Sequence, residues 1–171
     1  MLMAKSRRGV LVSILLAALP FSVMGAGPSI GFGGTGDIKL GTPLSRMLTR
    51  LEQPIRKTDQ QPDGHCFYAR PENDRRLALM FEADVLTRID VMQPGLATAA
   101  GIQVGDPASK VWEQYGEAIK DEPDAYDDRE RYLTLSSNDG KYAIRFMTNN
   151  RKISAIISGT TKSVEYVDGC L

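Results

Sequence analysis

The chain contains one histidine and two cysteines, so few residues are available for nucleophilic catalysis. His65 and Cys66 are neighbours, and neighbours on an extended segment point to opposite sides, which is poor geometry for a nucleophile and its base. A Ser-His-Asp triad would also depend on His65, and a metal site built from several histidines is excluded. We therefore predict no catalytic residue, no metal and no cofactor. An enzyme with an unrecognised site is the third hypothesis for function.

The two cysteines are better explained as a pair. An even number of cysteines in an oxidising compartment predicts a disulfide, here between Cys66 and Cys170. In the chain-entropy model, closing a loop of this length contributes roughly 4–5 kcal/mol to stability. The alternative, a reactive Cys66 beside His65, would leave free thiols in the exported protein.

Carboxylates are most concentrated between residues 117 and 130, where clustered oxygens could bind a hard cation such as calcium. The alternating Asp-Asn-Gly spacing of a dedicated calcium loop is missing, and Lys120, Arg129 and Arg131 partly neutralise the segment. We expect a solvated loop there, with calcium binding as the alternative. The acidic residues are Glu117, Asp121, Glu122, Asp124, Asp127, Asp128 and Glu130.

Recognition of a protein partner is the chemistry that the sequence favours. Alternation along the predicted strands places Tyr, Met and Arg side chains together on one face of a sheet, and protein interfaces are enriched in these residue types. The alternative is an ordinary exposed sheet surface, on which scattered apolar side chains are normal. The predicted binding residues are Met80, Arg88, Tyr132, Arg145, Met147 and Ile156.

The elements that must position this face are organised around residues 101–116, which predict a short strand, a turn and a helix. Asp106 is a favoured N-cap residue, and Pro107 suits the first helical position. An apolar stripe at helical spacing and a terminating glycine follow, namely Val111, Trp112, Tyr115 and Gly116. We expect the stripe to face inward, as part of the scaffold.

The same pattern occurs 64 positions earlier, over residues 38–48. Ile38 corresponds to Ile102, and Pro43 corresponds to Pro107. Because a cap, a proline and an apolar stripe rarely recur in register by chance, we predict a tandem repeat.

Alternating apolar residues predict a β-hairpin in each half, with a further strand before each hairpin. The predicted fold class is α+β: two tandem repeats, each a helix plus an antiparallel meander, with the helices packed on one face of a sheet. The glycines near the start lack a following Gly-Lys-Ser/Thr, so they predict a tether rather than a phosphate-binding loop. The predicted segments are a signal peptide (1–25), a glycine-rich tether (26–36), a first repeat (37–93) and a second repeat with a terminal strand at 164–167 (94–171).

The first 25 residues have the features of a signal peptide. A basic segment (Lys5, Arg7 and Arg8) precedes an apolar run, and small residues predict cleavage after Gly25 or Ala26. We expect export by the general secretory route to the periplasm or the medium, with the twin-arginine route as the alternative. The apolar run is shorter than the about 20 residues of a membrane span, and no cysteine follows it, so no stable membrane anchor is expected.

The charge of the mature part excludes another class of partner. Removing Lys5, Arg7 and Arg8 from 21 basic residues leaves 18 against 21 acidic ones, a net charge of −3. A mildly acidic protein without basic runs lacks the positively charged surface that binds nucleic-acid phosphates, so we expect no nucleic-acid partner.

A family resemblance rests on Ile-Gln-Val-Gly-Asp-Pro-x-x-Lys-Val at 102–111, followed by Tyr-Gly at 115–116. This pattern resembles the strand-turn-helix start of the small outer-membrane lipoprotein A family, which includes BamE. The tandem arrangement is similar to that of the β-lactamase inhibitory proteins, and the second half also resembles exported bacterial proteins of unknown role. The chain departs from these families in having no lipobox cysteine and no matching inhibitory contact residue.

The resemblance implies a protein that acts by binding other proteins. Our first hypothesis is an exported, non-catalytic protein-binding module, inhibitor-like or envelope-associated, with a protein partner in the envelope or outside the cell. The second hypothesis is a structural or assembly factor of the cell envelope.

Overall fold

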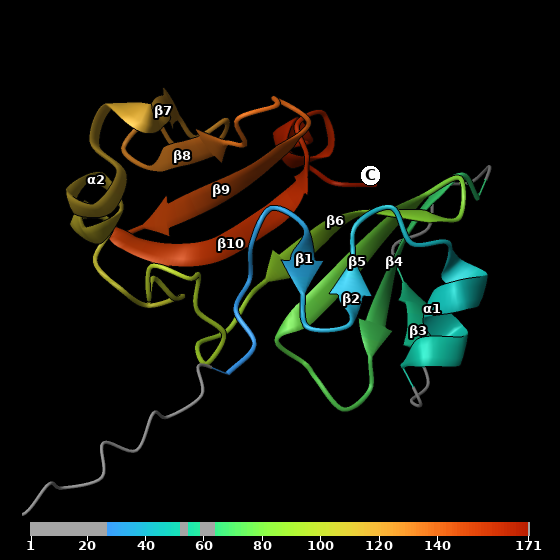
Figure 1. Cartoon of the computed structure of the whole chain (residues 1–171). Coiled ribbons are helices and arrows are strands. Elements are labelled where there is room, and N and C mark those ends of the chain that lie inside the picture. Colours follow the sequence, from blue (N-terminus) through green and yellow to red (C-terminus); the bar gives the residue numbers. More distant parts are fainter. Residues whose placement is uncertain (1–26, 52–54, 59–63, 171) are drawn as a thin grey trace, which may run out of the picture.

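A computed structural model describes residues 27–51, 55–58 and 64–170 (Figure 1). The predicted signal peptide and its cleavage site lie outside the described residues. None of the helices in the described chain is long and apolar enough to cross a membrane.

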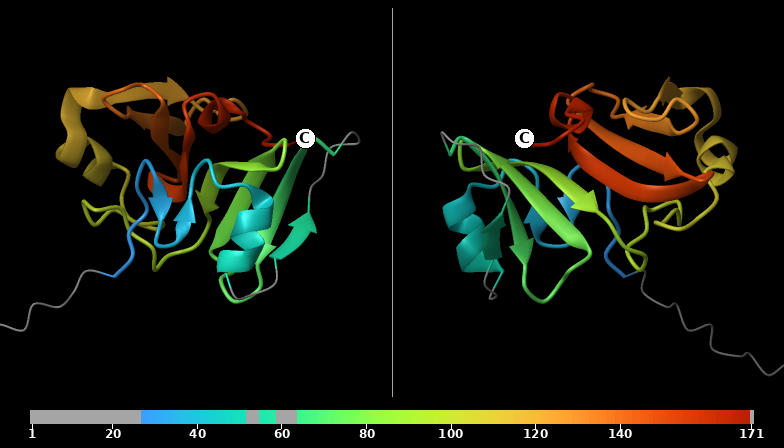
Figure 2. Two further views of the ribbon diagram at one scale, coloured as in Figure 1. Left: turned by 45° about the vertical axis from the view of Figure 1, so that its right-hand side comes forward. Right: turned by 180° about the vertical axis from the view of Figure 1, so that it is seen from behind.

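One antiparallel sheet of eight strands forms the body of the protein, in the order β3-β4-β5-β6-β10-β9-β8-β7. β6 and β10 pair at its centre, where Asp90 lies opposite Ile157. Seen from behind, β4 to β6 lie in front of α1 and the β1–β2 hairpin (Figure 2). The strands are β3 (Ile55–Thr58), β4 (Cys66–Pro71), β5 (Leu77–Glu82), β6 (Val85–Val91), β7 (Ile119–Pro123), β8 (Arg131–Ser136), β9 (Tyr142–Asn149) and β10 (Lys152–Thr160).

A second, two-stranded sheet pairs β1 (Gly34–Thr35) with β2 (Ile38–Lys39). Its start lies in the segment predicted to be a flexible tether, but the described part of that segment packs against the fold. Ile30 is fully buried and bridges to Thr98, and the Ser158 hydroxyl donates a hydrogen bond to the carbonyl of Gly31 at 2.7 Å. The tether prediction is therefore wrong from Ile30 onward.

Two short helices, α1 (Leu44–Arg50) and α2 (Ser109–Tyr115), have seven residues each. Met47 of α1 and Val111 of α2 are fully buried in one apolar cluster, which also contains the stacked rings of Phe67 and Phe81 at 5.3 Å. Burial of such side chains is the main stabilising contribution to the fold. Two 3-10 turns, η1 (Gly116–Ala118) and η2 (Ser163–Glu165), complete the helical elements.

The start of α2 differs from the prediction. The helix begins two residues later than expected, with Ala108 at the N-cap position and no side-chain cap. The Asp106 carboxylate instead accepts hydrogen bonds from the backbone N–H of Gln103 at 3.0 Å and from Lys110 Nζ at 2.8 Å. The bond from Lys110 lowers the pKa of Asp106. Asp106 thus stabilises the turn before the helix rather than the helix terminus.

Trp112 is also placed differently from the prediction. Val111 is fully buried and the Tyr115 ring lies 6.3 Å from the Phe146 ring, so these two residues dock α2 on the sheet. Trp112 is 36% exposed and lies to the side of that contact. Its predicted role as an inward-facing core residue is wrong.

The predicted fold class of two helix-plus-meander repeats is wrong as well, because the fold is dominated by one eight-stranded sheet. Three strands were missed: β1, which lies in the predicted tether, and β3 and β7, whose charged sequences suit sheet edges and lack apolar alternation. The short strand predicted at residues 102–104 is irregular backbone instead. β7 falls within the acidic segment that was predicted to be a loop, and the predicted strand at 164–167 begins in η2 instead. The tandem-repeat hypothesis is a statement about sequence ancestry that this arrangement does not test.

Candidate functional site

The face of the sheet opposite the helices carries five of the six predicted binding residues. Met80 lies opposite Arg88 in the β5–β6 register, and Tyr132 lies opposite Met147 in the β8–β9 register. With Arg145, these side chains alternate with those of the apolar cluster under the helices. We call this side of the sheet the polar face.

Ile156, the sixth predicted binding residue, points into the apolar cluster instead. The register of β10 shifts between Ile153 and Ala155, and both Ile153 and Ile156 are buried on the helix side. A bulge adds one residue to a strand and so sends the following side chains to the other face. The prediction that Ile156 contacts a partner is therefore wrong.

The centre of the polar face is covered by residues 161–170, which we call the covering segment, and by the loop at 124–126. The Tyr126 hydroxyl donates a hydrogen bond to Asp168 and so joins this loop to the covering segment. Of the five predicted binding residues on this face, only Met147 is partly exposed. The other four are buried and are not free to meet a partner: Met80, Arg88, Tyr132 and Arg145.

A buried ion pair lies under this cover. Arg88 Nε donates to Asp90 Oδ1 at 2.6 Å, Nη2 donates to Oδ2 at 3.1 Å, and Nη1 donates to the carbonyl of Tyr166 at 2.8 Å. The Tyr68 hydroxyl donates to Asp90 Oδ2 at 3.0 Å. Burial alone would lower the pKa of Arg88, but the charge of Asp90, the hydrogen bonds to it and the nearby tyrosines together outweigh burial, and the pKa is raised. Each charge has its partner, so the cluster holds the cover in place.

Tyr68 lies in the same buried environment as the Arg88–Asp90 ion pair. Burial, together with the negative charge of Asp90, raises the pKa of the Tyr68 hydroxyl well above its usual value. A Cβ on Gly169 would collide with the Tyr68 ring, so glycine permits the covering segment to approach this closely.

Arg145 is buried with weaker compensation. Its Nε donates to the Thr134 hydroxyl at 3.1 Å, its guanidinium lies over the Tyr132 ring at 4.9 Å, and Glu122 Oε2 is 3.9 Å away. Burial lowers the pKa of Arg145.

The predicted disulfide is confirmed. Cys66 at the start of β4 is bonded to Cys170, across a sequence separation of 104 residues, and both residues are buried. The bond ties the covering segment to the sheet, and the alternative of a reactive Cys66 thiol is excluded in this structure.

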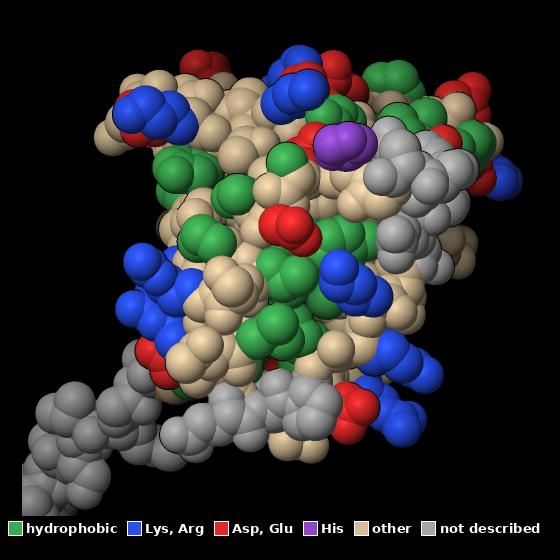
Figure 3. Space-filling model, turned by 90° about the vertical axis from the view of Figure 1, so that its right-hand side faces the viewer, with side chains coloured by type: hydrophobic (Ala, Val, Ile, Leu, Met, Phe, Trp, Pro, Cys, Tyr) green, Lys and Arg blue, Asp and Glu red, His purple; other side chains and the backbone are tan. Residues whose placement is uncertain are grey.

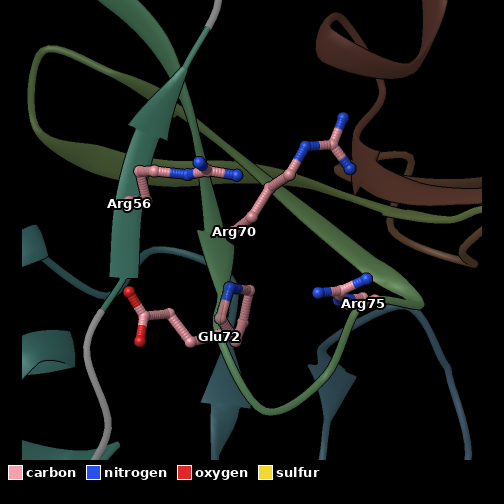
Figure 4. Close-up of a pocket in the computed structure, with 5 residues that line it drawn as sticks. Arg56, Arg70, Glu72 and Arg75 are labelled. Atoms are coloured by element: carbon pink, nitrogen blue, oxygen red, sulfur yellow. The ribbon is translucent and has the colours of Figure 1, made fainter.

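An open cleft of about 590 Å³ lies at the β3 end of the polar face (Figure 4). Arg56 extends from β3, Arg70 from the neighbouring β4, and Arg75 from the connection between β4 and β5. The Glu72 side chain, which also lines the cleft, points to the opposite side from Arg75. We call this site the arginine cleft.

The arginine cleft contains one carboxylate, Glu72, but its three arginines form no ion pair among the described residues. Arg56 and Arg70 lie directly opposite each other in the β3–β4 register, and like charges so placed are destabilising. In the described part of the chain, no carboxylate forms an ion pair with Arg56, Arg70 or Arg75. Such a group of guanidiniums can bind carboxylates in bidentate fashion.

The two edge strands of the sheet, β7 and β3, differ in whether their charged side chains form ion pairs. On β7, Lys120 Nζ lies 2.9 Å from Glu122, and Asp121 lies 2.6 Å from Nε of Arg131 on β8, so these charges are paired. On β3, Arg56 has no such partner among the described residues. Figure 3 shows this end of the molecule, where apolar side chains are exposed in the middle and both basic and acidic side chains lie among and around them.

The acidic segment offers no metal site in the described chain, where no group of three or more His, Cys, Asp or Glu side chains could hold an ion. The alternative of calcium binding is therefore not supported by any cluster of ligands in the described chain. The arginine cleft is not evident in the sequence, because its residues come from three separate elements and only the pairing of β3 with β4 brings them together.

No protein-family model and no curated protein matches this chain. Among solved structures, the uncharacterised protein YfeY from Escherichia coli is similar at a TM-score of 0.49 and 16% identity, covering 77% of this chain and 99% of YfeY. An extracellular SCP-domain protein from Bacillus anthracis has a TM-score of 0.49 at 6% identity, covering 73% of this chain and 45% of its own. A cysteine-rich secretory protein from Staphylococcus aureus has a TM-score of 0.47 at 8% identity, covering 72% and 44%.

The chain thus spans less than half the length of the last two proteins. At these TM-scores the likenesses support no statement about function. They also leave untested the resemblance to the small outer-membrane lipoprotein A family and to the β-lactamase inhibitory proteins.

Proposed function

We propose that this protein is an exported, non-catalytic binding module that holds an acidic, extended segment of a protein partner in the arginine cleft. The observation that carries the proposal is the direct opposition of Arg56 and Arg70, with Arg75 nearby and no ion-pairing carboxylate among the described residues. A partner that supplied carboxylates would relieve this repulsion and gain charge-assisted hydrogen bonds. Binding therefore takes place on the polar face, but at its open end rather than at its covered centre.

Export is supported by the disulfide and by the predicted signal peptide. Disulfides persist in oxidising compartments such as the periplasm and the extracellular space. The Cys66–Cys170 bond would be reduced in most bacterial cytosols, and the covering segment would lose its covalent attachment.

An extended partner segment is favoured by the position of the cleft beside an edge strand. β3 is the last strand at its end of the sheet, and no strand of the described chain pairs with its outer side, where another strand could add by main-chain hydrogen bonds. A strand added there would run beside Arg56, and acidic side chains at alternate positions would point toward the polar face.

Protection of the edge is a simpler explanation for part of this charge. Basic residues on an edge strand discourage sheet-to-sheet association, which accounts for Arg56 and Lys57. It does not account for Arg70 or Arg75, which lie on other elements and face the same cleft. The convergence of three elements favours ligand binding.

A fluorescently labelled peptide of alternating Glu and Thr tests the proposal, because Thr favours strands and Glu supplies the carboxylates. Anisotropy at low salt should show saturable binding to the exported protein. The double substitution Arg56→Gln/Arg70→Gln should weaken it on the order of ten-fold or more, since each lost charged hydrogen bond is worth about 1.5–3 kcal/mol.

The matched control is Arg46→Gln/Arg50→Gln on α1, which removes the same charge from exposed positions outside the cleft. It should leave affinity within about two-fold, because exposed charges elsewhere act only through weak screened fields. Equal losses in the two double variants, or no binding of the peptide by the native protein, would overturn the proposal. So would binding of inorganic polyphosphate without binding of the peptide.

A further inference from the structure

The exposure of Trp112 is not required by the docking of α2 on the sheet. It is the single tryptophan of the chain and is 36% exposed, although α2 already docks on the sheet through Val111 and Tyr115. Large apolar side chains held at the surface by an ordered helix often mark binding sites when they line a concavity.

Trp112 lines a cavity of about 400 Å³ between the start of α2 and the adjoining ends of β8 and β9. This volume is in the range of small-molecule sites. Pro107, Ala108 and Trp112 form its apolar wall. The other lining residues are polar: Ser109, Arg129, Glu130, Arg131, Thr148 and Arg151. We call this site the tryptophan cavity.

A neighbouring hollow of about 420 Å³ extends the tryptophan cavity on its polar side. The two share Arg129, Glu130 and Arg151. The hollow adds Asp127, Asn149 and Asn150 to the lining. The combined site therefore has an aromatic wall at one end and a mixture of donors and acceptors at the other.

The walls of the site are held by hydrogen bonds. The Ala108 N–H donates to the carbonyl of Arg151 at 2.9 Å, which joins the start of α2 to the β9–β10 turn. The Glu130 carboxylate accepts from the Thr148 hydroxyl at 2.8 Å and from the Asn150 N–H at 2.7 Å. A site held in this way needs little reorganisation to bind a ligand.

The three arginines of this site have N–H groups that are not used in the hydrogen bonds described. Arg129 uses Nε and Nη2 on Asp127, and Arg131 uses Nε on Asp121. Arg151 makes no ion pair in the described part of the chain. A guanidinium has five N–H groups, so all three arginines can donate further bonds.

We propose that the tryptophan cavity binds a sugar ring that carries a carboxylate, with the ring stacked on Trp112 and the carboxylate on Arg151. A pyranose ring has C–H groups on its faces and hydroxyls around its rim, which match an indole wall beside paired arginines, carboxylates and amides. An apolar or purely aromatic ligand would leave those polar groups without partners. The carboxylate follows from Arg151, which has no ion pair in the described part of the chain, whereas Arg129 and Arg131 are already paired with Asp127 and Asp121.

This site is independent of the arginine cleft. It lies on the helix side of the sheet, between α2 and β8–β9, whereas the cleft lies on the polar face at β3 and β4. An acidic peptide bound in the cleft and a sugar bound at Trp112 should not displace each other.

Tryptophan fluorescence tests the proposal directly, because Trp112 is the only source of the signal. Titration of the exported protein with tri-galacturonic acid should shift the emission to shorter wavelength and saturate, and neutral maltotriose should bind on the order of ten-fold more weakly. Arg151→Gln should weaken tri-galacturonic acid by a similar factor while changing maltotriose little.

Calorimetry extends the test to Trp112→Ala, which should lose the heat of binding while its urea midpoint stays close to the native one. Leu48→Ala, another exposed apolar side chain on a helix, should bind normally. An unchanged emission spectrum with the acidic sugar, equal binding of the two sugars, or unchanged binding in Arg151→Gln would overturn the proposal. Displacement of the sugar by the acidic peptide would overturn the separateness of the two sites.

Discussion

Arg88 and the facing pair Arg56 and Arg70 lie on the same polar face, and they differ in what surrounds them. Arg88 is 5% exposed under the covering segment, with Asp90 at 2.6 Å and two backbone carbonyls as further acceptors. Arg56 and Arg70 lie beyond that segment at the end of the same face, opposite each other and without an ion-pairing carboxylate in the described chain.

The difference follows from solvation. A charge that is removed from water must have a partner within the fold, since its desolvation costs several kcal/mol. A charge at the open end keeps its water, so like charges can stay close together at a small cost. Partnered arginines therefore serve the structure, and unpartnered ones at the rim are available to a ligand.

The strongest test of this contrast is Asp90→Asn, which keeps the shape of the side chain but leaves the charge of Arg88 buried without compensation. Breaking one side of a buried pair should lower the free energy of unfolding by about 3–5 kcal/mol, measured by urea denaturation. Asp84→Asn in the exposed β5–β6 turn, where Asn tolerates the positive φ of 60°, is the control and should be close to neutral. A loss below about 1 kcal/mol in Asp90→Asn would contradict the structural role of the pair.

A somewhat smaller effect is expected from removing the disulfide that holds the cover. Cys66→Ala/Cys170→Ala should lower the free energy of unfolding by about 2–5 kcal/mol, because the unfolded chain regains the freedom of a long loop. Hydrogen exchange should then show faster exchange at residues 163–170 than in β8 and β9, whose pairing does not involve that bond. Uniformly faster exchange throughout the sheet would show that the bond supports the whole fold rather than the cover.

The smallest effect, with the opposite sign, is expected at the open end. Arg56→Gln should leave the free energy of unfolding unchanged or raise it by up to about 1 kcal/mol, because it removes one of two facing like charges. Arg76→Gln is the comparison, since Arg76 is paired with Asp74 at 2.7 Å and donates to the carbonyl of Gly95, and it should be slightly destabilising. If Arg56→Gln were the more destabilising of the two, the cleft would have a partner within the protein.

The sequence predicted the parts of the fold that depend on local pattern. Apolar alternation located the hairpin strands, and the even number of cysteines in a chain predicted to be exported was enough to pair Cys66 with Cys170. The charged edge strands β3 and β7 carry no such alternation, and the bulge in β10 reverses the orientation of Ile156 without any glycine to mark it.

The candidate site was less predictable, because it depends on which segments meet. The cover over Arg88 comes from residues more than seventy positions away, as the hydrogen bond to Ser163 shows. The arginine cleft exists only because β3 pairs with β4 in one register. Trp112 has a helical spacing typical of a core residue, but α2 docks on the sheet through Val111 and Tyr115, and Trp112 stays exposed.

The pairing of β6 with β10 at the centre of the sheet also sets an order of assembly. β6 ends at Val91 and β10, the last strand along the chain, begins at Lys152. The central contact of the sheet can therefore form only after the chain has been synthesised through β10. In a chain exported from its N-terminus, Cys66 would emerge long before Cys170, 104 residues later, and would have to wait as a thiol. Such non-local contacts slow folding, so the period before closure is when this protein would depend most on the oxidising machinery and chaperones of its compartment.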